Sequence, residues 1–368
     1  MSDTLRCYRA IRHQLHQLHP QKPSVPLSRT LDTLAWFITG IVRSGKCQLP
    51  AVASQMPFAQ RESQVKKLSR FLQNERIEER CAYLSFARQL LAALAKRLGR
   101  LVFVIDGSEI GRGCRALVVS VRYLGRTFPV AFLVEEGPKG HFSEASHLKL
   151  FQTVQGITPP GVPVIVLGDG EFDGVELLER LQAWGWEYVC RTARNAQVEV
   201  EGETVAFQEV NVLYGETVEL PEVRFTAAGY GPLLAVAAWR KGCKEPIYLI
   251  SNLELGEEAI YWYKKRYGIE TFFSDQKSRG FHLHKSHLSD PKRLARLMIA
   301  ACLAYIWLVF LGRTAQKQGW MKAIHREKRC DLSLFQLGIA LLNYLLLHSF
   351  SIPANFLAPP SYPSTVRY

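Results

Sequence analysis

Two short runs of apolar residues, each leading into an aspartate, constrain the fold more than any other feature of the chain. Residues 101–105 (LVFVI) precede Asp106, and residues 163–167 (PVIVL) precede a glycine and Asp169. Runs without polar alternation are typical of strands buried on both faces of an α/β sheet. Ligand sites gather at the carboxyl ends of such strands, and the glycine that follows each aspartate permits a sharp turn. Both aspartates are therefore candidate site residues, unless each is only a turn residue or a helix cap.

The surrounding sequence predicts an α/β fold, with a mixed sheet flanked by helices. Alternating and continuous apolar runs predict further strands at residues 116–123, 127–134 and 187–191, and helical periodicity predicts helices at residues 144–154 and 174–184. Residues 197–252 contain six short strand-like runs, two of which are residues 216–220 and 223–228. A helical pattern returns at residues 257–279.

The charge balance favours a polyanionic partner. Lysine and arginine number 46 against 33 acidic residues, which gives a formal net charge of +13. Cationic surfaces release condensed counterions when they neutralise phosphates, so nucleic acid is the expected partner, with a merely basic surface as the alternative. The eight cysteines lack zinc-site spacing and indicate buried thiols in a reducing compartment. Because the first 15 residues lack the apolar core of a signal peptide, we expect a cytoplasmic protein.

These patterns divide the 368 residues into three expected regions. Residues 1–95 are predicted to form a helical domain that contacts DNA, although a purely structural helical cap is the alternative. Residues 96–290 form the expected α/β domain, with a β-rich insertion at about 197–252. Residues 291–368 are expected to be a helical C-terminal region. Its apolar run at residues 297–311 is shorter than the about 20 residues that span a membrane, which predicts a buried core helix.

The segment YWYKKRYGIETFFSDQKSRG carries four residues that helical geometry would place together. Tyr263, Arg266, Glu270 and Lys277 are separated by 3, 4 and 7 positions. At 3.6 residues per turn, all four fall within about 60° of one helix face. The glutamate can bind a metal ion while the arginine and lysine bind phosphates beside it. The alternative is an exposed helix with ordinary charge pairs four residues apart.

Three carboxylates, Asp106, Asp169 and Glu270, are the candidate catalytic and metal-binding residues. Phosphodiester chemistry needs charge neutralisation, an activated nucleophile and a stabilised leaving oxygen, which two Mg²⁺ ions about 3.5–4 Å apart can supply. Mg²⁺, or Mn²⁺ in its place, prefers oxygen ligands of this kind. The neighbouring histidines at 282, 284 and 287 do not have a zinc-site spacing, and we interpret them as basic or hydrogen-bonding surface.

The segment resembles the insertion-sequence-4 family of DDE transposases. Tyr263, Arg266, Glu270 and Lys277 match that family's Y-x2-R-x3-E-x6-K signature, and the blocks around Asp106 and Asp169 resemble its two aspartate blocks. The resemblance covers about residues 95–310 and implies a ribonuclease H-like fold. It also implies that the three carboxylates bind the metals.

The resemblance assigns further residues to DNA. Tyr263, Arg266 and Lys277 would contact phosphates of the transposon end, and Arg191 and Arg194 would lie near DNA. Family members carry a base-stacking Trp in the β-rich insertion. Trp239 and Tyr248 are the candidates here, but neither matches cleanly, and each fits a core position better.

The function expected from these observations is cut-and-paste DNA transposition in the bacterial cytoplasm. The protein would bind double-stranded transposon ends as a homodimer, cut the end phosphodiester with activated water, and join the freed 3′-hydroxyl to target DNA. A metal-dependent nuclease without strand transfer shares the same carboxylates. A DNA-binding relative that has lost catalysis is a further alternative.

Overall fold

A mixed sheet of ten strands runs through the computed structural model, which describes residues 2–19, 23–57, 60–77, 80–137, 141–326 and 329–357. The strands are β1 (Leu101–Gly111), β2 (Cys114–Tyr123), β3 (Arg126–Glu136), β4 (Val164–Gly168), β5 (Glu187–Arg191), β6 (Gln197–Val200), β7 (Glu203–Ala206), β8 (Thr217–Phe225), β9 (Tyr230–Ala238) and β10 (Ile247–Ser251). Their order across the sheet is β3-β2-β1-β4-β5-β10-β9-β8-β6-β7. β1 pairs antiparallel with β2 but parallel with β4, which pairs parallel with β5. The predicted mixed α/β fold is confirmed.

Helices cover both faces of this sheet and make up most of the described N-terminal and C-terminal regions. The α-helices are α1 (Asp3–Gln17), α2 (Val25–Ser44), α3 (Leu49–Ala53), α4 (Arg61–Gln73), α5 (Ser85–Leu98), α6 (Glu144–Ile157), α7 (Val175–Ala183), α8 (Gly256–Tyr263), α9 (Gly268–Gln276), α10 (Pro291–Lys317), α11 (Met321–Ile324) and α12 (Leu334–Leu347). Shorter turns are the π-helical η1 (Arg80–Leu84) and the 3-10 helices η2 (Phe207–Glu209), η3 (Lys264–Tyr267) and η4 (Leu283–Lys285).

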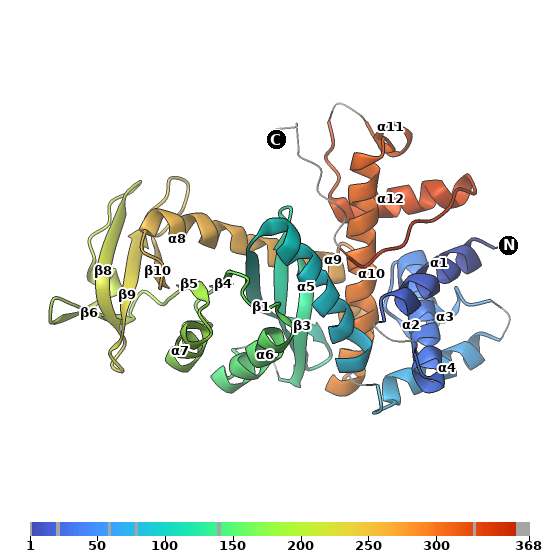
Figure 1. Cartoon of the computed structure of the whole chain (residues 1–368), viewed down its shortest axis with the longest axis horizontal. Helices are drawn as coiled ribbons and strands as arrows, with labels where there is room; N and C mark the ends of the chain where they lie inside the picture. Colours follow the sequence, from blue (N-terminus) through green and yellow to red (C-terminus); the bar gives the residue numbers. More distant parts are fainter. Residues whose placement is uncertain are drawn as a thin grey trace.

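The two parallel crossovers explain which helices share a face. α6 connects β3 to β4 and α7 connects β4 to β5, and right-handed crossovers in the same direction place both helices on one face. α5 contacts α6 on that face, whereas α8 and α9 pack on the strands from the other side (Figure 1). The β-rich strands β8, β9 and β10 lie at one end of the molecule and the N-terminal helices at the other (Figure 1).

The apolar run at residues 297–311 lies within α10, which is buried as predicted. α10 is long and apolar enough to cross a membrane, but 89% of its most apolar window is buried inside the protein. It contacts α2, α12, β3 and α9, so neighbours surround it and no single apolar face is needed. The Asp290 side chain accepts a hydrogen bond from the Arg293 N–H at 2.7 Å and fixes the start of the helix. Residues of all three predicted regions therefore contribute to one hydrophobic core, while the domain boundaries themselves remain predictions.

The prediction that the first strand ends before Asp106 is wrong. β1 continues to Gly111, and Asp106 lies opposite Val118 of β2. The parallel ladder with β4 stops earlier, at Val104 opposite Leu167. Asp106 thus follows the last parallel pair, so it still lies at the carboxyl end of that pairing.

Gly107 consequently makes no turn. A Cβ at this position would lie 2.8 Å from Cε2 of Phe142, so the glycine instead allows close packing of β1 against that ring.

Candidate functional site

Three elements bring the predicted carboxylates to one end of the β1–β4 pair. Asp106 lies on β1, Asp169 directly follows β4, and Glu270 lies on α9, which packs against β1. The two aspartates are close because their strands are neighbours in the sheet. The glutamate reaches the same place because α9 crosses over β1 and β3.

Arg266 contacts all three carboxylates at once. Its Nη1 lies 3.4 Å from Oδ2 of Asp106 and 3.9 Å from Oδ2 of Asp169. Its Nη2 donates to Oε1 of Glu270 at 3.0 Å. The side chains of Arg266 and Asp106 are only 16% and 19% exposed, whereas those of Asp169 and Glu270 are 35% and 43% exposed and face solvent. Residues that lie 160 positions apart in the chain therefore form one cluster.

The segment carrying the signature is not the continuous helix that its spacing predicts. α8 ends at Tyr263, η3 spans Lys264–Tyr267, and α9 ends at Gln276, so Lys277 lies just beyond the helix with a non-helical backbone. A 3-10 stretch has about three residues per turn and rotates the face calculated for an ideal helix.

Two signature residues nevertheless remain beside the carboxylate cluster. Nζ of Lys277 donates to Oγ of Ser108 at 2.6 Å, two residues beyond Asp106 on β1. The Arg266 guanidinium lies 5.9 Å from the centre of the Tyr263 ring. Burial raises the pKa of Tyr263, so this side chain is a neutral hydrogen-bond donor at neutral pH.

Negative charge exceeds positive charge in this cluster. Burial raises the pKa of Asp106 to about 6, and the nearby charge of Asp169 acts in the same direction. Arg266 and the Gly107 N–H, which donates to Oδ1 of Asp106 at 2.7 Å, oppose the shift without cancelling it. The cluster therefore favours either a proton on Asp106 or an additional cation.

The donor set suits a divalent metal. All three side chains offer carboxylate oxygens, the ligands that Mg²⁺ and Mn²⁺ prefer. Among the described residues, no group of three acidic, histidine or cysteine side chains already encloses a space for one ion. Arg266 instead lies among the carboxylates, and its single positive charge does not balance them. The residues fit a metal site if the guanidinium gives up at least one of its contacts.

This charge imbalance predicts that the metal-free protein is stabilised by replacing Asp106 with asparagine. The pKa of Asp106 is raised from 3.8 to about 6 in the fold, so ionisation of this residue reduces stability as the pH rises through that interval. At about pH 8 the free energy of unfolding of the variant should exceed that of the wild type by on the order of 1–3 kcal/mol. The difference between the two proteins should vanish near pH 4. Urea unfolding in EDTA across this pH range measures both values. Equal stability of the two proteins at the higher pH would contradict the expectation.

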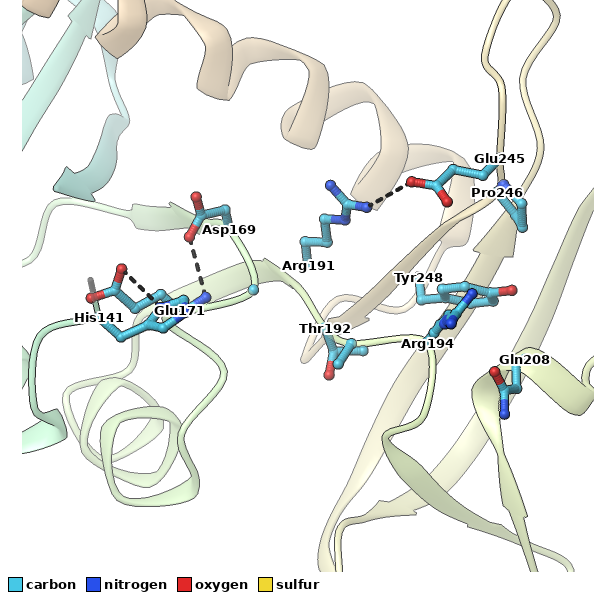
Figure 2. A pocket seen from close by; sticks show the side chains of 12 residues that line it. His141, Asp169, Glu171, Arg191, Thr192, Arg194, Gln208, Glu245, Pro246 and Tyr248 are labelled. Carbon is cyan, nitrogen blue, oxygen red and sulfur yellow. Dashed lines mark hydrogen bonds and ion pairs between the residues drawn. The ribbon is translucent and has the colours of Figure 1, made fainter. Parts of the chain in front are cut away.

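Sequence reasoning missed a group that holds the loop after Asp169. Glu171 accepts a hydrogen bond from the Phe142 N–H, and its oxygens lie 3.4 Å from Nε2 of buried His147 and 3.3 Å from Nδ1 of His141. Burial acts to raise the pKa of Glu171, but the contacts with His147 and Phe142 outweigh burial and lower this pKa below its usual value. The Glu171 N–H in turn donates to Oδ1 of Asp169 at 3.2 Å (Figure 2). Glu171 lies in the block around Asp169 that resembles the family's second aspartate block, but nothing in the sequence indicated its histidine partners.

A cavity of about 620 Å³ extends from Asp169 toward the β-rich insertion. Arg191 is the last residue of β5. Arg191 and Arg194 both line this cavity (Figure 2). Nη2 of Arg191 lies 3.9 Å from Oε1 of Glu245. The two predicted DNA-contacting arginines therefore share a cavity with a catalytic candidate.

The two aromatic candidates of the insertion occupy different environments. Tyr248 is 8% exposed, lines the same cavity, and packs against Phe207 with ring centres 5.4 Å apart. Trp239 packs edge-on against Tyr214, and its Nε1 donates to the Cys243 carbonyl at 3.1 Å. Both rings are thus held by protein contacts.

Both the sequence and the fold of this chain are similar to those of known transposases. Residues 99–307, more than half of the chain, match the family described as the transposase DDE domain. No curated protein matches the chain. The fold is similar to that of the piggyBac transposase in a cryo-EM structure of its synaptic complex with hairpin DNA. That match covers 100% of this chain and 87% of the other, with a TM-score of 0.50 and 13% sequence identity. The chain therefore belongs to the family of transposases that carry a DDE domain, and it is an enzyme that acts on DNA.

Proposed function

We propose that this protein cuts the phosphodiester bonds at transposon ends and joins the resulting 3′-hydroxyl groups to target DNA. The observation that carries the proposal is the convergence of Asp106, Asp169 and Glu270 on one guanidinium. An isolated helical charge pair between Arg266 and Glu270 would not explain why both aspartates lie at the same point. The spacing of the signature residues further supports placement in the insertion-sequence-4 subgroup.

The DDE transposase family generally uses divalent metal ions, and we propose two Mg²⁺ ions here, with Mn²⁺ as a substitute. When bound, such ions lower the pKa of water and neutralise charge on the scissile phosphate. Asp106, Asp169 and Glu270 would hold them.

The signature cations would act on the DNA phosphates. Arg266 would exchange a carboxylate contact for a phosphate contact, and its planar donors suit bidentate binding of either group. Lys277, whose Nζ donates to Ser108 at the edge of the cluster, would bind a second phosphate as a point charge. Arg191 and Arg194 would contact DNA that enters the adjoining cavity. A homodimer on two DNA ends is part of the proposal.

Strand transfer separates this proposal from a nuclease that only hydrolyses DNA. A duplex with an exposed 3′-hydroxyl at the transposon end, incubated with Mg²⁺ and a supercoiled target plasmid, should give covalently joined products. The same duplex with a 3′-deoxy end serves as the control, because it lacks the attacking hydroxyl. Cleavage without any joined product would support the nuclease. Metal-independent DNA binding without cleavage would support a catalytically inactive relative.

A further inference from the structure

A second groove, of about 680 Å³, lies between the β9–β10 connection and η3. Its lining includes Arg240, Lys241 and Cys243 from the connection, and Lys264, Arg266 and Tyr267 from the segment that carries the signature. None of the described residues that line it is acidic, unlike the cavity beside Asp169. A concave surface with four cations and no acidic side chain is complementary to a polyanion.

Three of the four cations in this groove have no carboxylate partner among the described residues, whereas the fourth, Arg266, contacts the carboxylate cluster. Within the described part of the chain, Arg240, Lys241 and Lys264 form no ion pair with a carboxylate. Nε of Arg240 is buried and has no hydrogen-bond partner among the described residues. The one acidic residue of the β9–β10 connection, Glu245, pairs with Arg191 in the other cavity (Figure 2). The groove therefore holds three cations that no described carboxylate pairs with, and this charge favours an anionic ligand.

The groove and the carboxylate cluster share one residue. Arg266 lines the groove and also contacts Asp106, Asp169 and Glu270. An anionic chain that followed the groove would reach the three carboxylates at this guanidinium. Tyr267, which is 64% exposed, adds a flat aromatic surface on the same wall.

We propose that this groove binds the sugar-phosphate backbone of the DNA strand that leads to the cleavage site. Arg240 and Lys241 on one wall and Lys264 on the other would each contact a phosphate. The β9–β10 connection and η3 would thus hold the strand from two sides. This inference rests on the proposed function only in taking DNA as the ligand, because phosphate binding here requires neither metal nor cleavage.

The salt dependence of DNA binding tests whether the groove binds DNA phosphates. Arg240→Gln, Lys241→Gln and Lys264→Gln are combined in one variant, and binding of a linear duplex is measured in EDTA at several salt concentrations. Each lost phosphate contact lowers the slope of log affinity against log salt by about 0.9, so a decrease of about 2 to 3 is expected. A matched variant, Lys96→Gln with Lys149→Gln and Arg180→Gln, removes equal charge from exposed positions on α5, α6 and α7. A wild-type slope in the groove variant, or an equal decrease in the control, would overturn the proposal.

Cys243 offers a readout that does not depend on changing the cations. Its thiol is exposed and lines the groove, so it should attack a mixed-disulfide tether placed on a backbone phosphate near the cleavage position, forming a protein–DNA disulfide and releasing the small thiol of the tether. Cys243→Ser should abolish this cross-link, whereas Cys330→Ser, which changes the exposed thiol near α12, should leave it unchanged. Cross-linking that persists in Cys243→Ser would count against the groove. Because neither experiment includes metal, failure of strand transfer alone would leave both outcomes unaffected.

Discussion

Replacing Glu270 with glutamine is expected to reduce DNA cleavage and strand transfer by at least about a thousandfold. The substitution keeps the size of the side chain and an oxygen that can accept from Arg266, but it removes one of the three negative charges facing that guanidinium. Loss of several kcal/mol of charge stabilisation in the transition state accounts for an effect of this size, since each 1.4 kcal/mol is a tenfold change in rate. Affinity for DNA should stay within about threefold of wild type, because phosphate-binding cations supply most of that affinity.

The experiment compares three proteins on one end-sequence duplex with Mg²⁺. Glu257→Gln is the matched control, since Glu257 lies in the first turn of α8, in the same segment but outside the carboxylate cluster. It should cleave at nearly the wild-type rate, and the unfolding midpoints of all three proteins establish that each is folded. Cleavage by Glu270→Gln within about tenfold of wild type would exclude Glu270 as an essential residue and with it the proposed active site.

The fold was predictable from sequence where apolar patterns alone decide the structure. The strand at residues 101–105 and the buried helix α10 are examples, because burial on all sides requires runs without polar interruption. The strand β8 shows the limit. Its two halves read as separate strands because Pro221 interrupts them, yet the chain passes this point with a register shift and a positive φ at Glu222. Proline is tolerated at such an irregularity because no ladder hydrogen bond is required from it.

The candidate site was predictable in its residues but not in its arrangement. Acidic residues at strand ends and at helical spacing could be recognised locally, as Asp169 and Glu270 were. The position of Arg266 among all three carboxylates depends on how α9 crosses the sheet, which is a tertiary feature. The same holds for the contact of His147 with Glu171, because the two residues lie on separate elements. Local patterns carry no information on such long-range contacts.

A second large effect, on the stability of the protein, is expected from removing one partner of a buried ion pair between α9 and β3. Arg126, at the start of β3, pairs with Asp275 of α9, and their side chains are only 12% and 7% exposed. Burial raises the pKa of Asp275 although Arg126 opposes the shift, so the pair does not fully offset the cost of removing the carboxylate from water. Removing either partner alone leaves an uncompensated buried charge. Arg126→Met and Asp275→Leu should therefore each lower the free energy of unfolding by about 3–5 kcal/mol.

The double variant Arg126→Met/Asp275→Leu distinguishes this cause from a simple loss of packing. With both charges gone, its stability should return to within about 1–2 kcal/mol of wild type, so the two single effects should not add. Glu75→Gln, which removes the exposed pair with Lys292, is the control and should change stability by less than about 1 kcal/mol. Urea unfolding measures all four variants. Since α9 also carries Glu270, the single variants should lose cleavage activity together with stability, and the double variant should recover both. Additive losses in the double variant would show that shape, rather than charge, holds α9 against β3.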